Sequence, residues 1–132
     1  ADKEALKGLT VLLVDDDVRN IFALRQVLSE KGIHLMQATS GADAIAECHV
    51  THKVDLALID IMMAEMNGYT TASRLKEIKS IENTPLVAMS GHATKDQAFI
   101  NSEFVELLPK PIDVGKMFEV IIRLVQSNKE NK

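Results

Sequence analysis

The residues Leu56-Ala57-Leu58-Ile59 form an apolar run that ends at a single carboxylate, Asp60. A continuous apolar run of about four to eight residues is typical of a strand that is buried on both faces of a sheet. An ionised Asp is almost never buried without a partner, so we expect Asp60 where the strand leaves the core. Ligands of open parallel sheets bind outside the carboxyl ends of the strands. Asp60 is therefore a candidate site residue.

Four other segments have the composition of strands, and each is bounded by turn signals or polar residues. They are Thr10–Val14, Ile33–Ala38, Leu86–Met89 and Phe104–Leu108. Between and after the strands, apolar residues recur at helical spacing. The expected helices contain Ile21 to Leu28, a segment capped by Ser40, Ala72 to Ile78, a weakly patterned segment from about Lys95 to Ser102, and a segment capped by Asp113. Five strands alternating with five helices predict an α/β fold with a parallel sheet and right-handed crossovers.

The 132 residues are enough for one domain with a sizeable core. We expect residues 1–9 to be a linker or N-terminal arm, residues 10–127 to form the domain, and residues 128–132 to be a polar tail. The chain begins at Ala1 without a methionine, which suggests a domain excised from a longer protein.

Composition narrows the possible functions. The net charge of −4 and the isoelectric point near 5.5 argue against a nucleic-acid surface, which is usually basic. No apolar run approaches the roughly 18 residues of a membrane span, so we expect no membrane insertion by this domain. Cys48 is the single cysteine, which excludes an intrachain disulfide framework and a thiolate metal cluster. A reducing cytoplasmic location is the simplest expectation.

Polar residues follow four of the five predicted strands. Asp15 and Asp16 follow the first, Asp60 follows the third, Ser90 the fourth and Lys110 the fifth. The carboxyl ends of parallel strands lie at one edge of a sheet, so these side chains are expected to gather there.

Three carboxylates and one ammonium group leave an excess of two negative charges. Two carboxylates about 4 Å apart repel by about 4 kcal/mol at an effective dielectric constant near 20. A divalent cation would balance this charge, and oxygen ligands favour Mg²⁺ or Mn²⁺ over zinc. The hydroxyl and the ammonium would then receive an anion, most simply a phosphoryl group.

Four motifs together resemble the receiver domain of two-component response regulators. They are Val14-Asp15-Asp16-Asp17, Asp60-Ile61-Met62-Met63 with Met66-Asn67-Gly68, Ser90-Gly91, and Pro109-Lys110-Pro111. The resemblance runs from about Thr10 to Gln126. It implies a flavodoxin-like, doubly wound (βα)5 fold with a five-stranded parallel sheet in the order 2-1-3-4-5.

The resemblance also implies roles for individual residues. Asp60 would be the phosphoacceptor and would form an acyl phosphate. Mg²⁺, with Mn²⁺ as an alternative, would be bound by Asp15, Asp16, Asp60 and the backbone carbonyl of Met62. The phosphoryl group would be bound by Lys110, Ser90, the backbone N–H of Gly91 and the backbone of Met62, and the Lys110–Pro111 peptide bond would be cis.

The sequence departs from the family pattern in three places. Ala64 stands where family members usually have proline. Leu107 stands where they usually have a Tyr or Phe that changes position on phosphorylation. The interval from Ser90 to Lys110 is about two residues shorter than usual, which leaves the fourth helix least defined.

The predicted function is that of a phosphoacceptor domain in a His-to-Asp phosphorelay, which promotes only its own phosphorylation and dephosphorylation. Its partner would be a histidine kinase or histidine phosphotransfer domain. The opening Val14-Asp15-Asp16-Asp17 followed by Arg19-Asn20 resembles receivers attached to hybrid histidine kinases. One alternative is an interaction module that signals without phosphorylation, which the departures at Ala64 and Leu107 favour. Another is a Mg²⁺-dependent phosphatase with an Asp nucleophile, but such enzymes carry a second Asp where this chain has Met62.

Overall fold

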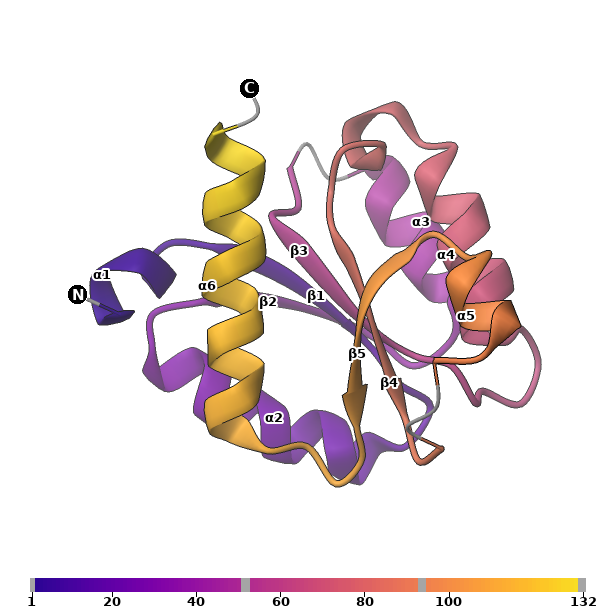
Figure 1. Cartoon of the computed structure of the whole chain (residues 1–132), viewed down its shortest axis with the longest axis horizontal. Helices are drawn as coiled ribbons and strands as arrows, with labels where there is room; N and C mark the ends of the chain where they lie inside the picture. Colours follow the sequence, from indigo (N-terminus) through magenta and orange to yellow (C-terminus); the bar gives the residue numbers. More distant parts are fainter. Residues whose placement is uncertain (1, 51–52, 93–94, 131–132) are drawn as a thin grey trace.

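A five-stranded parallel sheet forms the centre of the computed structural model, which describes residues 2–50, 53–92 and 95–130. The strand order is β2-β1-β3-β4-β5, as the resemblance implied (Figure 1). The strands are β1 (Thr10–Val14), β2 (His34–Ala38), β3 (Leu56–Asp60), β4 (Leu86–Ser90) and β5 (Phe104–Pro109). The predicted α/β fold with a parallel sheet is therefore confirmed.

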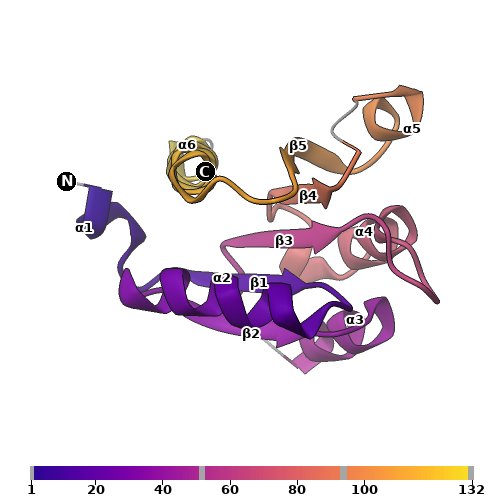
Figure 2. The same ribbon diagram turned by 90° about the horizontal axis from the view of Figure 1, so that it is seen from below.

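Helices cover both faces of the sheet (Figures 1 and 2). One face carries α1 (Asp2–Leu6), α2 (Val18–Glu30) and α6 (Val114–Glu130). The other carries α3 (Gly41–Val50), α4 (Gly68–Lys76), the 3-10 turn η1 (Lys79–Ile81) and α5 (Gln97–Ile100). This arrangement buries every residue of the central strands β3 and β4, which explains their continuous apolar sequences.

Alternation along each strand divides the core into two apolar clusters. In β1, Val11 and Leu13 pack with α2 and α6, whereas Leu12 and Val14 pack with α3 and α4. Two helices begin at the predicted caps, because Ser40 Oγ accepts the N–H of Asp43 and Asp113 Oδ1 accepts the N–H of Lys116.

Both ends of the chain contain helical residues. The N-terminal segment, expected to be a linker or arm, contains helix α1, which packs against α6, and Leu6 and Leu9 are buried. Among residues 4–9, whose burial is described, these two leucines are the buried ones, and their spacing sets no helical period in the sequence. At the other end, α6 continues to Glu130 through residues expected to be a polar tail.

Helix α5 is shorter than predicted, spanning four residues from Gln97 to Ile100 rather than about Lys95 to Ser102. Asp96 caps its first turn and Phe99 is its buried residue. A single apolar anchor supports only one helical turn, which explains the weak pattern in the sequence.

Candidate functional site

The sheet register brings the predicted site residues to one edge. Val14 pairs with Ile59 and Asp60 pairs with Met89, so β1, β3 and β4 end at the same level. The N–H of Lys110 donates to the carbonyl of Ser90 at 2.8 Å, which extends the ladder to β5. The backbone ladder therefore sets the relative positions of the side chains.

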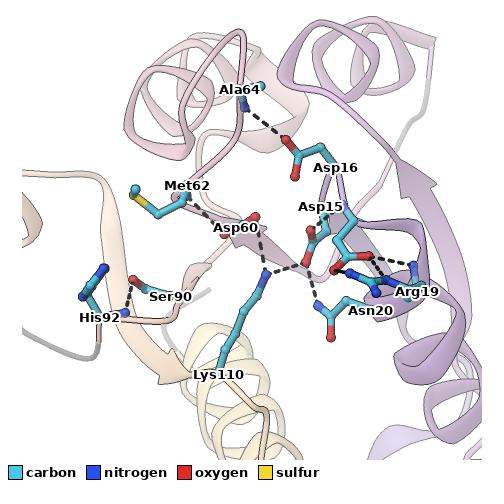
Figure 3. A network of polar contacts seen from close by, with 11 residues as sticks. Asp15, Asp16, Arg19, Asn20, Asp60, Met62, Ala64, Ser90, His92 and Lys110 are labelled. Carbon is cyan, nitrogen blue, oxygen red and sulfur yellow. Dashed lines mark hydrogen bonds and ion pairs between the residues drawn. The ribbon is translucent and has the colours of Figure 1, made fainter.

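Lys110 bridges two buried carboxylates (Figure 3). Its Nζ lies 2.9 Å from Asp15 Oδ2 and 3.4 Å from Asp60 Oδ2. Burial alone would lower the pKa of Lys110, but the hydrogen bonds and charges of Asp15 and Asp60 outweigh it and raise the pKa above its usual value. Lys110 is therefore a fixed cation at neutral pH.

Asp60 is a carboxylate whose ionised form is disfavoured by its surroundings. Burial raises its pKa above the usual value, and the neighbouring charge of Asp15 raises it further. Lys110 and the N–H of Met62, which donates to Asp60 Oδ1 at 3.1 Å, act in the opposite direction. A further positive charge beside Asp60 would lower the free-energy cost of keeping its carboxylate ionised.

The three carboxylates form a cluster that can hold a divalent cation. Asp15, Asp16 and Asp60 each offer an oxygen, and these oxygens lie within 4.8 Å of one another. Asp15 and Asp60 are buried while Asp16 is exposed, so the cluster opens to solvent on one side. One lysine does not neutralise three carboxylates, and the all-oxygen donor set suits Mg²⁺ or Mn²⁺. The residues present therefore fit the expected metal.

Asp15 is held by donors on both of its oxygens. The N–H of Asp17 donates to Oδ1 at 2.9 Å, and the side-chain amide of Asn20 donates to Oδ2 at 2.6 Å. Asn20 is a site residue that was not predicted from the sequence, although its place three residues after the helix cap Asp17 is a signal that could have found it. Asn20 lies on the first turn of α2, facing the strand ends (Figure 3).

Asp17 belongs to the helix start and not to the carboxylate cluster. Its Oδ1 accepts the N–H of Arg19 at 3.0 Å and thereby caps α2. The hydrogen bonds from Arg19 lower the pKa of Asp17.

The loop that joins β3 to α4, residues 61–67, is closed tightly over the end of β3. A Cβ added at Gly68 would lie 2.5 Å from the carbonyl oxygen of Asp60 and 2.7 Å from Cα of Ile61. The N–H of Gly68 also donates to the carbonyl of Ile61 at 2.9 Å. Glycine is therefore required by close backbone approach, and this fixes the path of the loop beside Asp60.

Ser90 and Gly91 lie at the end of β4, next to the cluster but not bonded into it. Ser90 is 3% exposed, and its Oγ accepts the N–H of His92 at 3.0 Å. A Cβ added at Gly91 would meet nothing within 4 Å, so no packing in this conformation requires glycine there. The Lys110–Pro111 bond is cis, as the resemblance implied.

The region around Leu107 is organised differently from the aromatic arrangement usual in the family. Leu107 is buried in the apolar cluster beneath α3 and α4. The preceding residue, Glu106, forms ion pairs with Lys95 (2.9 Å) and Arg123 (2.8 Å). Burial would raise the pKa of Glu106, but the N–H of Leu107 and these two cations hold it at about 2. The ion pairs link β5 to the segment before α5 and to α6.

Comparison with known proteins agrees with this geometry. The response regulator receiver domain family matches residues 11–122. The sensor histidine kinase CheAY of Helicobacter pylori is 30% identical over 127 residues, covering 94% of this chain and 16% of the relative. The autoinducer 1 sensor kinase/phosphatase LuxN of Vibrio campbellii is 32% identical over 120 residues, covering 90% of this chain and 14% of the relative. The chain thus spans less than a fifth of these curated relatives.

The fold is also shared with solved structures. The receiver domain of the sensor histidine kinase PA1611 from Pseudomonas aeruginosa superposes with a TM-score of 0.82 at 18% identity, covering 90% of this chain and 98% of that chain. That protein was solved with a magnesium ion coordinated in its active site cleft. Within the described residues, no helix is long and apolar enough to cross a membrane. With the family match extending over most of its length, the chain belongs to the response regulator receiver domain family of two-component signalling.

Proposed function

We propose that Asp60 is the phosphoacceptor of this receiver domain and that Lys110 and Ser90 assist the transfer. The observation that carries the proposal is the position of the Lys110 ammonium group, because its Nζ contacts both Asp15 and Asp60 at the carboxyl ends of the strands. A fixed ammonium beside a carboxylate can bind a phosphoryl oxygen while that carboxylate reacts.

In the proposed reaction, an Asp60 carboxylate oxygen attacks the phosphorus of a phosphohistidine. A P–O bond forms to Asp60, the P–N bond to the donor histidine breaks, and the released imidazole nitrogen takes up a proton. Lys110 balances negative charge on the transferred group, since its raised pKa keeps it protonated. Hydrolysis of the acyl phosphate by water later returns Asp60 to the carboxylate.

Asp15, Asp16, Asp60 and the backbone carbonyl of Met62 would hold Mg²⁺, with Mn²⁺ as an alternative. When bound, the cation neutralises the carboxylates and the phosphoryl oxygens. Ser90 would exchange its hydrogen bond from His92 for one to the phosphoryl group, and the N–H of Gly91 would donate to another oxygen.

The partner in this proposal is a histidine kinase or histidine phosphotransfer domain. A groove of about 610 Å³ lies beside the cluster, between α2 and the segment after β5, and Lys110 and Asn20 contribute to its lining. On the neighbouring surface of α2, Val18 and Phe22 are exposed and could contact such a partner. The proposal includes a place within a hybrid histidine kinase in the cytoplasm. The kinase context is supported by the similarity to CheAY and LuxN, which are named as a sensor histidine kinase and a sensor kinase/phosphatase.

Incubation of the protein with Mg²⁺ and acetyl phosphate tests the proposal. Intact-mass spectrometry should detect one added phosphoryl group on the wild-type protein and none on Asp60→Asn. A phosphorylated histidine kinase serves as a second donor. Failure of both donors on a folded protein that binds Mg²⁺ would reject the phosphoacceptor role.

A second candidate is signalling by protein interaction without phosphorylation, which the apolar Leu107 favours. Under this candidate, Asp60→Asn retains full output in cells. Under the phosphoacceptor proposal, the same variant loses its response to the stimulus.

A further inference from the structure

The loop of residues 61–67 provides two backbone donors to the carboxylate cluster. The N–H of Met62 donates to Asp60 Oδ1 at 3.1 Å, and the N–H of Ala64 donates to Asp16 Oδ2 at 3.0 Å (Figure 3). The second contact joins residues 48 positions apart in the sequence. It therefore ties the loop after β3 to the loop after β1.

The contact with the N–H of Ala64 matters most for the orientation of the Asp16 side chain, because the other two carboxylates are held in place by burial and by Lys110. Asp15 and Asp60 are buried and are both bonded to Lys110. Asp16 is exposed, and an exposed carboxylate must lose side-chain freedom when it becomes a ligand. A donor that orders Asp16 in advance reduces that cost.

We propose that the backbone N–H of Ala64 is a positioning group for the metal site. It fixes Oδ2 of Asp16 and leaves Oδ1 for a cation shared with Asp15 and Asp60. The inference rests on the proposed function, because it takes Mg²⁺ as that cation. Proline has no N–H, so a chain with proline at position 64 could not make this contact. Ala64 therefore differs from the usual family residue in hydrogen bonding as well as in stiffness.

Titration calorimetry with Mg²⁺ alone tests the role of the N–H. We compare the wild-type protein with Ala64→Pro, which lacks the donor, and with the matched control Ala64→Gly, which keeps it. A semisynthetic protein with a backbone ester at position 64 removes the N–H without the stiffness of proline. The ester and the proline variant should bind Mg²⁺ roughly three- to ten-fold more weakly, as expected for ordering one side chain on binding. Ala64→Gly should stay within about two-fold of the wild type, because it keeps the donor.

The amide signal of Ala64 in a nitrogen–proton NMR spectrum provides a second readout. Its hydrogen exchange should be slow without Mg²⁺ and remain slow when Mg²⁺ is saturating, and Asp16→Ala should accelerate it. A purely structural role for the loop predicts that the unfolding midpoint changes while Mg²⁺ affinity does not.

Three results would overturn the inference. They are equal Mg²⁺ affinity in the ester and wild-type proteins, tighter binding by the ester, and exposure of the Ala64 amide on Mg²⁺ addition. Tighter binding would mean that the N–H competes with the cation for Asp16. If the wild-type protein itself binds no Mg²⁺, the proposed metal site fails together with this inference. If the wild type binds and the ester binds equally well, the inference alone fails.

Discussion

Replacement of Gly68 by alanine should destabilise the protein and disturb the backbone of Asp60. The added Cβ would lie 2.5 Å from the Asp60 carbonyl oxygen. Cβ atoms in proteins are essentially never closer than 3.0 Å to such a neighbour, so the two atoms must separate by at least about 0.5 Å. Overpacking against a well-packed site costs about 1–3 kcal/mol. Alanine recovers up to about 1 kcal/mol through helix propensity at the start of α4. The clash is with backbone atoms, which cannot rotate away, so the cost lies in the upper part of that range, about 2–3 kcal/mol, and the expected net loss is about 1–2 kcal/mol.

Urea denaturation without Mg²⁺ measures this effect. With an m-value of about 2 kcal/mol per molar, the midpoint should fall by about 0.5–1 M. Gly91→Ala is the matched control, because its Cβ meets nothing within 4 Å and its φ is not positive. This control should leave stability unchanged or raise it by about 0.4–1 kcal/mol. Equal midpoints for Gly68→Ala and the wild type would refute the close-approach argument, as would equal losses in the two variants.

Three further substitutions test the electrostatics of the fold. Asp60→Asn should raise the urea midpoint at neutral pH, because the raised pKa of Asp60 means that its ionised form destabilises the folded state. This gain in stability should shrink as the pH falls through the pKa of Asp60 in the folded protein, and a gain that does not depend on pH would contradict this reasoning. Asn20→Ala should cost about 1–3 kcal/mol in chemical denaturation, since it removes a donor from the buried, charged Asp15, and an unchanged midpoint would show that the remaining donors suffice. The pKa of Glu106 is held at about 2, so its contribution to stability is present above about pH 4.5 and is lost as the pH falls toward 2. Glu106→Gln should remove this part of the pH dependence of stability, and an acid-unfolding profile identical to that of the wild type would refute the prediction.

The convergence of the charged residues could be predicted because it depends on strand ends. Each strand has a recognisable apolar run, and a parallel sheet brings the following residues to one edge. The sequence therefore sufficed to place Asp15, Asp60 and Lys110 together. The same reasoning predicted Ser90 at the end of β4, but it did not predict that its hydroxyl would be bonded to the His92 N–H.

Contacts that depend on loop paths could not be predicted in the same way. The donor from Ala64 to Asp16 is a backbone N–H, which leaves no side-chain signal in the sequence. The pairing of Glu106 with Arg123 depends on how α6 lies across β5, and a sequence pattern does not specify that packing. Helix α1 was missed because most of its residues are polar and it is held to α6 by tertiary contacts.

Locating the phosphoryl group by chemical trapping tests the central claim most directly. The protein is treated with Mg²⁺ and a phosphoryl donor, reduced with borohydride, digested and examined by peptide mass spectrometry. Borohydride converts an aspartyl phosphate to homoserine, so the proposal predicts homoserine at position 60 and unmodified aspartate at positions 15 and 16. Homoserine at either of those two positions, or a phosphoryl adduct that survives in Asp60→Asn, would contradict the assignment of Asp60 as the phosphoacceptor.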